Sequence, residues 1–514
     1  MAARPASSST AATGSTASRP RIGCRSRAGR PARCSCGSPD GAAARGDGRV
    51  SCPHRRRFIV FLRRGGGPPG PPRQQAHSAR KVPMSAVIQV ERRDSRARSV
   101  FRAVSGNFLE MYDFTVYGYY AAAIAATFFP SGNEFVSLML AFSVFGAGFL
   151  MRPIGAIVLG AYMDRHGRRK GLILSLSLMA VGTMCVAFVP GYQSIGLVAP
   201  AIVLFGRLLQ GFSAGAELGG VSVYLAEIAS RGNRGFFCSW QSASQQVAVV
   251  FAASLGVLLN AFVPAQQMTS WGWRVPFLVG CLIVPFLFYI RRTLQESDEF
   301  AARKHHPSIG EITRTIVANA GLILAGMGLV IMTTTSFYLI TAYTPTFGKV
   351  VLKMSSFDAL LVTACVGVSN FIWLPISGAV SDRVGRRPVM LAFTILTVFT
   401  AYPAVQWLIH APSFGKLLAV ELWLSLLYAW YNGAMVVALT ELMPAKVRST
   451  GFSMAYSLAT MVGGFTPAIS TWLIHATGDK AAPGAWMGAA AVCGMVATLL
   501  LYRTKSAREQ YRLA

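Results

Sequence analysis

One eleven-residue pattern occurs twice in this chain, and its spacing constrains the fold more than any other feature. GAYMDRHGRRK spans 160–170 and GAVSDRVGRRP spans 378–388, so that Asp164 and Asp382 are 218 residues apart. A solenoid repeat has only about 20–50 residues, which excludes that architecture. Each copy lies between two apolar segments. The sequence therefore predicts two similar halves, each with a charged turn at a membrane surface, where the acid can meet a helix N-terminus and the arginines a neighbouring helix end.

The composition is typical of a membrane-embedded protein. Hydrophobic residues make up 53% of the chain and charged residues only 13%, yet the net charge is +29. From residue 101 onward we predict about twelve apolar stretches, each long enough to cross ~30 Å of hydrocarbon as a helix. We therefore expect an all-α integral membrane protein with transmembrane helices over 103–129, 135–161, 171–190, 197–222, 235–262, 273–292, 317–346, 356–380, 388–409, 415–440, 449–475 and 484–503.

The loop charges predict the orientation. Basic residues fall in alternate connections, for example at Arg231, Arg292 and Lys446, whereas connections such as 130–134 and 262–272 carry none. Since cytoplasmic loops carry the excess of Lys and Arg, we assign the basic connections to the cytoplasm. An even number of spans then puts both termini in the cytoplasm.

Residues 1–83 differ from the rest of the chain. They are rich in Arg, Gly, Pro, Ala and Ser, and they carry seventeen basic residues against two acidic ones. With so few aliphatic residues, this segment cannot build a core and is expected to be disordered. We expect it to be upstream sequence translated from a start codon placed before the true start at Met84. A basic tail that binds RNA or lipid, and an organellar transit peptide, are the alternatives.

Several longer stretches resemble a known family. They are GNFLEMYDF at 106–114, GRLLQGFSAGAELGGVSVYLAEIA at 206–229 and YNGAMVVALTELMPAKVRSTGFS at 431–453, together with the repeated loop. These stretches resemble the metabolite:proton symporter family of the major facilitator superfamily, in particular its branch for citrate and tricarballylate. The resemblance implies two six-helix halves related by a parallel repeat, with the substrate site between them near mid-membrane. The expected boundaries are a first half over 84–292, a cytoplasmic linker over 293–316 and a second half over 317–514.

The resemblance also implies a function. It predicts proton-coupled import of citrate or tricarballylate by alternating access, by a monomer in the cytoplasmic (inner) membrane of a bacterium, with no cofactor, metal or nucleic acid; co-transport of a cation stays open. Symport of a dicarboxylate or of a betaine-type osmolyte is the first alternative, and a non-transporting membrane sensor the second. No catalytic constellation or metal-ligand spacing is present in the sequence, so we do not expect an enzyme.

Charged residues inside apolar spans are the first candidates for the site, because a charge is costly in a bilayer. Arg152 and Arg207 lie near mid-membrane, where two guanidiniums suit a substrate with several carboxylates. Bracing of helices is the alternative for both, and the superfamily resemblance implies a role of Arg207 in proton coupling. Glu110 and Asp113, at i, i+3 on one polar stripe of the first span, are the leading proton carriers, with Glu217 third. A structural ion pair with the cytoplasmic gate is the alternative for Glu110.

Neutral polar residues in other spans are expected to complete a substrate cavity, because lipid-facing helices rarely carry so many. The candidates are Gln241, Ser244 and Gln245 on the fifth span, and Tyr338, Thr341, Tyr343, Asn370, Tyr431 and Asn432 in the second half. For the glycine-rich faces we expect close helix packing instead.

The charged loops are the expected gates, which would latch the outward-facing state. A second motif repeats with them, because Glu227 and Glu441 are each followed seven residues later by an arginine. The gating candidates are Gly160, Asp164, Arg165, Gly167, Arg168, Gly378, Asp382, Arg383, Gly385, Arg386, Glu227, Arg234, Glu441 and Arg448.

Overall fold

The computed structural model describes residues 100, 104, 107–215, 217–230, 232–292, 309–444 and 448–503, without the side chains at 164, 168, 217, 218, 290 and 291. The chain divides into two compact units, 1–89 and 90–514. The expected N-terminal extension, 1–83, and most of the expected linker, 293–308, lie outside the described residues. All of the described residues belong to the second unit.

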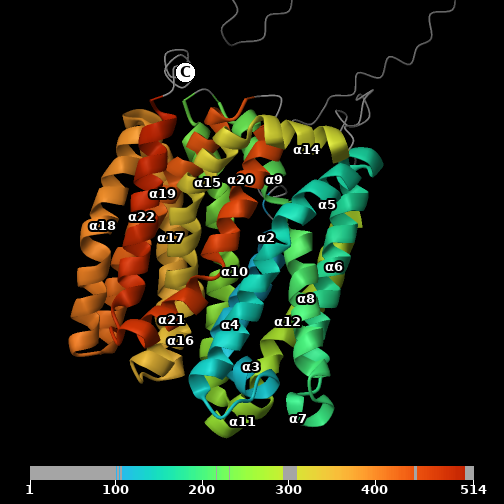
Figure 1. The fold of residues 1–514 in the computed structure, drawn as a ribbon, viewed down its shortest axis with the longest axis vertical. Helices are drawn as coiled ribbons and strands as arrows, with labels where there is room; N and C mark the ends of the chain where they lie inside the picture. The colour runs from blue at the N-terminus through green and yellow to red at the C-terminus, as the bar shows by residue number, and fades with distance from the viewer. Residues whose placement is uncertain are drawn as a thin grey trace, which may run out of the picture. The chain divides into compact units, whose positions relative to one another are not determined.

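The first part of this unit, up to residue 292, is helical throughout its described length, apart from short connections (Figure 1). Its main elements are α2 (Asn107–Tyr119), α3 (Ala121–Phe128), α4 (Glu134–Leu150), α5 (Arg152–His166), α6 (Arg168–Phe188), α7 (Tyr192–Ile195), α8 (Val198–Ala214), α9 (Glu217–Ile228), α10 (Arg234–Phe262), α11 (Ala265–Ser270), the 3₁₀ turn η1 (Gly272–Arg274) and α12 (Val275–Arg292).

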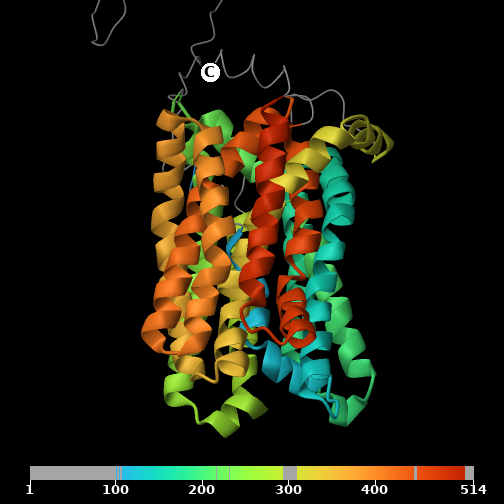
Figure 2. The same cartoon turned by 60° about the vertical axis from the view of Figure 1, so that its left-hand side comes forward.

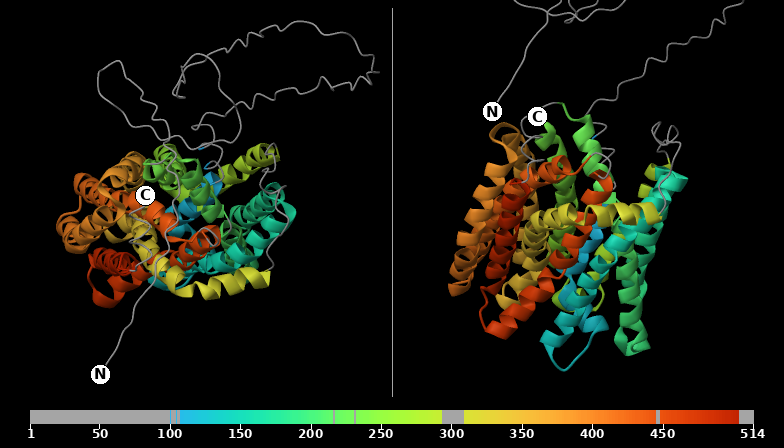
Figure 3. Two further views of the ribbon diagram at one scale, coloured as in Figure 1. Left: turned by 90° about the horizontal axis from the view of Figure 1, so that it is seen from above. Right: turned by 45° about the horizontal axis from the view of Figure 1, so that its top comes forward.

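The second part begins with α14 (Ile309–Ala318), which lies across one end of the bundle (Figures 1 and 3). The spans that follow are α15 (Ala320–Phe337), the π-helical η2 (Tyr338–Tyr343), α16 (Thr344–Thr346), the π-helical η3 (Phe347–Val351), α17 (Ser356–Val384), α18 (Arg386–His410), α19 (Phe414–Leu442), α20 (Arg448–Gly463), α21 (Thr466–Thr477) and α22 (Ala482–Leu501). In Figure 2 the helices of this part, coloured yellow to red, stand side by side with the blue and green helices of the first.

The predicted spans and the helices agree closely. In the described residues, 11 helices are long and apolar enough to cross a membrane. The predicted span 103–129 is not among them, because it is broken at Tyr120 into α2, of 13 residues, and α3, of 8. Counted with this broken span, the described helices match the twelve predicted ones, and no strand occurs among them. The predicted all-α membrane fold is confirmed.

The outer surface of the bundle is apolar, and several polar side chains are buried inside it. Large apolar side chains face outward, as at Leu282, 75% exposed, and Phe399, 72% exposed. Asn370 and Gln241, by contrast, are fully buried. A hydrocarbon solvent explains both observations, because apolar surface is not penalised there while polar groups must find partners inside the protein.

The expected glycine packing is present where α4, α5 and α8 meet. A Cβ atom on Gly211 would overlap the backbone oxygen of Gly148, and one on Gly215 would overlap that of Arg152. Only glycine lets the helix backbones approach so closely. Gly220 departs from the expectation, because no described atom lies within 4 Å of the position of its Cβ. These contacts fix α5 and α8 side by side, and each carries one of the two candidate arginines.

Candidate functional site: two buried arginines and two buried acids

The first buried pair joins α2 to α5. Nη2 of Arg152 lies 2.7 Å from Oε1 of Glu110, and the two residues are 1% and 3% exposed. Arg152 is the first residue of α5 and is followed by Pro153, at a break between α4 and α5. Proline at the start of a helix leaves no unpaired N–H, so the break brings the guanidinium into the interior at little cost. Glu110 thus forms a buried ion pair, but with Arg152 and not with the cytoplasmic gate that the alternative named.

The second buried group joins α2, α6 and α8 through a side-chain amide. Oδ2 of Asp113 accepts hydrogen bonds from the hydroxyl of Thr183 and from Nε2 of Gln210, the latter at 3.3 Å. Gln210 in turn accepts a bond of 2.6 Å from Nη1 of Arg207. Asp113 and Arg207 are both fully buried. A carboxylate, an amide and a guanidinium thus form one chain of charge-assisted hydrogen bonds.

One aromatic ring contacts both guanidiniums. The centroid of Phe114 is 5.0 Å from Cζ of Arg152 and 4.5 Å from Cζ of Arg207. Arg207 also lies 4.5 Å from the ring centroid of Tyr117. Cation–π contacts of this kind favour a guanidinium that has been taken out of water. Phe114 therefore holds two positive charges near each other in the interior.

Both arginines keep donors that no described residue accepts. These are Nε of Arg152, and Nε and Nη2 of Arg207. A buried guanidinium normally uses its donors, because an unmade hydrogen bond to a charged group is costly. The arrangement is chemically suited to a ligand with several carboxylates.

The first span does not present one polar stripe, as the i, i+3 spacing predicts. Glu110 reaches α5, whereas Asp113 reaches α6 and α8, and the hydroxyl of Tyr117 donates to the backbone oxygen of Ala141 on α4. All three point into the helices of the first part of the unit. Helical spacing gives the direction in which a side chain leaves its own helix. Which neighbouring helix it contacts depends on how the other helices pack around α2.

The fifth span contacts the second part of the unit through amides. Nδ2 of Asn370 on α17 donates to Oε1 of Gln246 on α10 at 3.3 Å, and Ser425 on α19 donates to Oδ1 of Asn370 at 2.8 Å. Gln241 accepts from Ser242 at 2.8 Å, and its Nε2 finds no described acceptor. The fifth-span candidates lie as follows: Gln241 and Gln245 are buried, and Ser244 donates to the backbone oxygen of Gln241.

The candidates on the seventh and tenth spans are buried but spread over several contacts. The ring of Tyr338 lies 5.0 Å from that of Phe149, which also contacts Arg152, so it is near the arginine group. Tyr431 instead donates to the backbone oxygen of Leu329, within the second part of the unit. The remaining three candidates are Thr341, Tyr343 and Asn432. Thr341 donates to the backbone oxygen of Phe337, Tyr343 accepts from Thr471 at its hydroxyl, and Asn432 donates to the hydroxyl of Tyr428.

The second copy of the repeated loop forms a latch on the N-terminus of α10. Oδ1 and Oδ2 of Asp382 accept the backbone N–H groups of Gly235 and Phe236, at 2.8 and 3.0 Å. Asn233, the N-cap residue of α10, makes no capping bond of its own. The acid therefore caps a helix that is distant in sequence and meets its positive end, as the motif predicts. Glycine is required at 235, because a Cβ there would overlap the backbone oxygen of Gly378.

Arg386 of the same loop completes this latch. Its Nη2 lies 2.7 Å from Asp382 and 3.3 Å from Glu441 at the end of α19. The loop, which connects α17 and α18, thus ties these two helices to α10 and α19.

The other gating candidates are less informative. The side chains of Asp164 and Arg168 in the first copy, and of Glu217, are outside the described set. Gly167 and Gly385 have φ of 98° and 101°, so both copies turn at a glycine. Arg448 donates to the backbone oxygen of Met443, while Arg165, Glu227, Arg234 and Arg383 are exposed and Gly160 is half-buried.

Two residues of this site, and one buried acid outside it, were not singled out from the sequence. Gln210 and Thr183 bind Asp113, and Glu421 is a buried acid within α19. Gln210 lies one helical turn after Arg207, which could have suggested their bond. Glu421 interrupts a predicted span as Glu110 does, so the rule applied to Glu110 could have found it.

The model of the family described as "Sugar (and other) transporter" matches residues 99–508. The chain belongs to this family, which is part of the major facilitator superfamily. The resemblance stated from the sequence is thereby confirmed at the level of the superfamily.

Individual relatives of this transporter cover nearly its whole described length. The citrate-proton symporter of Klebsiella pneumoniae is 61% identical over 410 residues, which is 80% of this chain and 92% of that protein. The one from Salmonella typhi is 59% identical, over 79% and 93% of the two chains. The alpha-ketoglutarate permease of Escherichia coli K12 is 31% identical, over 80% and 95%. These relatives are transporters, so the reading as a transporter rather than an enzyme is confirmed.

Solved structures give the same fold. The xylose transporter of E. coli, in a partially occluded inward-open conformation, matches with a TM-score of 0.64 at 18% identity, over 79% of this chain and 97% of that one. At this identity the match supports the fold alone, which is the major facilitator fold predicted from the repeat.

Proposed function

We propose that this transporter imports citrate, or the related tricarballylate, together with protons. The observation that carries the proposal is the gradient of similarity among its relatives. The two citrate-proton symporters are 61% and 59% identical to this chain, whereas the alpha-ketoglutarate permease is 31% identical over a similar length. Within one fold, the residues that select the substrate are expected to be shared more often with the relatives of higher overall identity.

The buried arginines support a polyanionic substrate. Arg152 and Arg207 both contact the ring of Phe114, and both keep buried donors that no described residue uses. A guanidinium can bind a carboxylate through two parallel hydrogen bonds. We propose that these two groups bind two carboxylates of the substrate, and that Gln241, with its unused Nε2, helps to bind its remaining oxygens. Ser244, Gln245, Tyr338, Thr341, Tyr343, Asn370, Tyr431 and Asn432 stay proposals as cavity-lining residues.

Coupling to protons follows from the charge of the substrate. Citrate carries about three negative charges near neutral pH, and moving each one into a negative interior costs ~2.3 kcal/mol per 100 mV, or ~7 kcal/mol in all. Protons that enter with it offset this cost. Asp113 is the leading carrier in this proposal, because its hydrogen bond through Gln210 connects it to Arg207. A substrate carboxylate on Arg207 would change the charge that Asp113 experiences.

Alternating access requires a gate that opens, and the Asp382 latch is suited to that role. It joins α17 to the N-terminus of α10 through hydrogen bonds to the main chain, and Arg386 at the start of α18 pairs with the same acid. We propose that it holds the cytoplasmic end closed in the outward-facing state and that the two halves, divided at 293–316, rock about the substrate.

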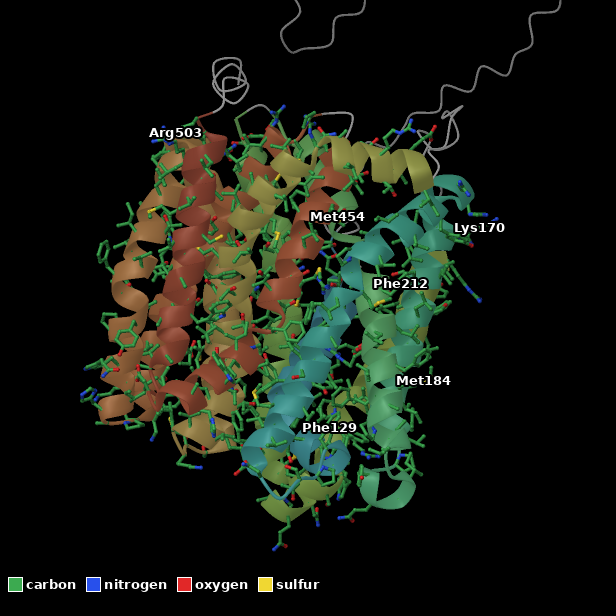
Figure 4. All side chains as sticks on the ribbon, in the orientation of Figure 1. Phe129, Lys170, Met184, Phe212, Met454 and Arg503 are labelled. Atoms are coloured by element: carbon green, nitrogen blue, oxygen red, sulfur yellow. The ribbon has the colours of Figure 1, made fainter. Side chains whose placement is uncertain are left out.

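The proposed setting is the cytoplasmic membrane of a bacterium, with one chain as the working unit and both termini inside. Lys170 and Arg503 lie at one end of the bundle and Phe129 at the other, as Figure 4 shows. A basic residue of the first repeated loop and one close to the C-terminus thus share an end of the bundle, which supports its assignment to the cytoplasm.

Uptake into proteoliposomes tests the proposed function. The full chain is reconstituted, a pH gradient is imposed, and accumulation of labelled citrate is measured before and after an uncoupler is added. We expect gradient-dependent accumulation that unlabelled citrate or tricarballylate suppresses and betaine does not. Competition by α-ketoglutarate alone would move the assignment to dicarboxylates. Citrate uptake that is the same with and without the pH gradient would exclude proton symport.

A further inference from the structure

A third buried acid lies in the second part of the unit, away from the arginine group. Glu421 is on α19 and is 6% exposed. It lies beside a small cavity of about 20 Å³, which has room for about one water molecule. The other residues around this cavity are Leu339, Tyr343, Thr344, Phe347, Val405, Leu408, Val420, Leu424 and Pro483.

The surroundings of Glu421 offer no compensating charge. The cavity is lined from η2, α16, η3, α18, α19 and α22, and the only other titratable group among its lining residues is Tyr343. No basic residue lines it, and Oε2 of Glu421 has no described hydrogen-bond partner. An isolated carboxylate in such a place is strongly disfavoured, so the acid is expected to hold a proton while the protein is in this arrangement.

The partner of Glu421 belongs to an irregular part of the seventh span. Oγ1 of Thr344 lies 2.9 Å from Oε1 of Glu421 and 3.2 Å from the backbone oxygen of Leu339. Thr344 follows the π-helical η2 directly and lies five residues beyond Leu339. One hydroxyl has one proton to donate, so Thr344 serves either the carboxylate or the π-helical carbonyl at a time. A protonated Glu421 needs no donor and leaves Thr344 to Leu339, whereas an ionised one draws Thr344 away.

The same segment closes against the first span. A Cβ on Gly118 would lie only 2.9 Å from the backbone oxygen of Ala342 in η2, and Thr346 donates to the backbone oxygen of Gly118 at 3.5 Å. In Figure 1, α14 lies across one end of the bundle, and α16 lies toward the opposite end. Lys170 of the first repeated loop is at the end with α14 (Figure 4). π-helical turns within a helix frequently mark functional segments. The proton on Glu421 is thus one hydrogen bond away from the segment that packs on α2.

We infer that Glu421 is a proton-binding site that controls closure of the outer end, separate from the protons carried with the substrate. When the seventh span moves away from α2, water reaches the carboxyl and it releases its proton to the outer solution. Closure takes a proton back from that solution, and Thr344 returns to Leu339. This inference rests on the proposed function for its direction of transport, although the proton site itself does not.

The closing step should therefore depend on outer pH. Because closure takes up one proton, each unit by which outer pH is raised should weaken closure by about tenfold, over the range in which the open-state carboxyl is ionised. Glu421→Gln keeps the size of the side chain and removes its charge, so it should abolish this dependence. Glu134→Gln, at the exposed start of α4, is the matched control.

Two measurements test the inference on the full chain in lipid. In the first, infrared spectra of the unmodified protein and of each variant are compared. The C=O band of a protonated buried carboxyl should be present in the unmodified protein and in Glu134→Gln, and absent from Glu421→Gln. This readout needs no substrate, so it decides whether Glu421 holds a proton even if the protein does not move citrate. An unchanged band in Glu421→Gln overturns the inference.

In the second measurement, citrate exchange is followed at fixed inner pH while outer pH is raised. The exchange rate of Glu421→Gln relative to the unmodified protein should rise by up to about tenfold per pH unit, and that of Glu134→Gln should stay constant. A constant ratio for Glu421→Gln overturns the gate. A lower final accumulation of citrate in Glu421→Gln also overturns it, because the proton of Glu421 would then travel with the substrate.

Discussion

The guanidinium of Arg207 and the carboxylate of Asp113 are bridged by the side-chain amide of Gln210. The amide oxygen accepts from Arg207 at 2.6 Å and the amide nitrogen donates to Asp113 at 3.3 Å. An amide can transmit a change at either end without carrying a charge of its own. Coupling between substrate and proton is expected to depend on it.

Replacing Gln210 by Leu should therefore lower gradient-driven accumulation of citrate by about tenfold, since a hydrogen bond to a charged group contributes about 1.5–3 kcal/mol. Accumulation and downhill exchange are measured together in proteoliposomes, with Gln193→Leu, at an exposed position, as the control. Equal losses in both assays would show a defect of folding rather than of coupling. Normal accumulation would contradict the bridge.

Removing either member of the Glu110 and Arg152 pair should destabilise the protein. Both are buried, so Glu110→Gln or Arg152→Gln leaves a buried charge without its partner and should cost about 3–5 kcal/mol. The double variant should recover part of that loss, because no charge remains unpaired. Thermal unfolding in detergent of both single variants and the double variant measures this coupling, and additive effects would contradict it.

Replacing Arg207 by Lys should raise the KM for citrate. Lysine retains the charge but loses the planar fork that binds carboxylates through two hydrogen bonds. We expect an increase of about tenfold, as loss of about 1.4 kcal/mol of binding would give. Arg314→Lys, at an exposed position on α14, is the control for the general effect of the substitution. An unchanged KM would leave Arg207 as a structural brace.

Replacing Asp382 by Asn should slow turnover more than it weakens binding. The change removes the ion pair with Arg386 and weakens the cap on α10, and a cap is worth about 1 kcal/mol. The expected result is slower citrate uptake with citrate affinity, measured by calorimetry, nearly unchanged. Asp164→Asn in the first copy is predicted to act in the same way. Unchanged uptake rates would exclude a gating role for the loops.

Replacing Gly211 by Ala should destabilise the fold, whereas Gly220→Ala should not. The added methyl at 211 overlaps the backbone oxygen of Gly148, and no described atom meets one at 220. Overpacking of this kind costs about 1–3 kcal/mol. Thermal unfolding of both variants compares two glycines of the same span, and equal stabilities would contradict the close packing of α8 on α4.

The number of spans and their bounds were predictable, because hydrocarbon thickness sets a length and an apolar composition that can be read residue by residue. The meeting of Asp382 with a helix N-terminus was predictable in kind, since an acid in a tight loop has few other favourable positions. Its target, the first turn of α10, was not, because the repeat contains no information on which helix its loop faces.

The contacts of the first span were the least predictable. Glu110 and Asp113 are three residues apart, and yet one meets a guanidinium and the other an amide on different helices. Such choices depend on how α5, α6 and α8 pack around α2, and on glycines such as Gly211 that allow them to come close. Glu421 could have been found as an acid inside a predicted span, but its bond with Thr344, which directly follows the π-helical η2, has no spacing pattern that marks it.

The Asp382 latch binds the main chain of its target. Gly235 and Phe236 offer only their N–H groups, which the start of α10 holds in place in every conformation of the side chains. When such a gate re-forms, no side chain on the target helix has to lose rotamer freedom, so the ordering cost falls on the loop alone. Closure of the latch is then limited by the approach of two rigid helices, and the side chain at 236 can vary in evolution without loss of the gate.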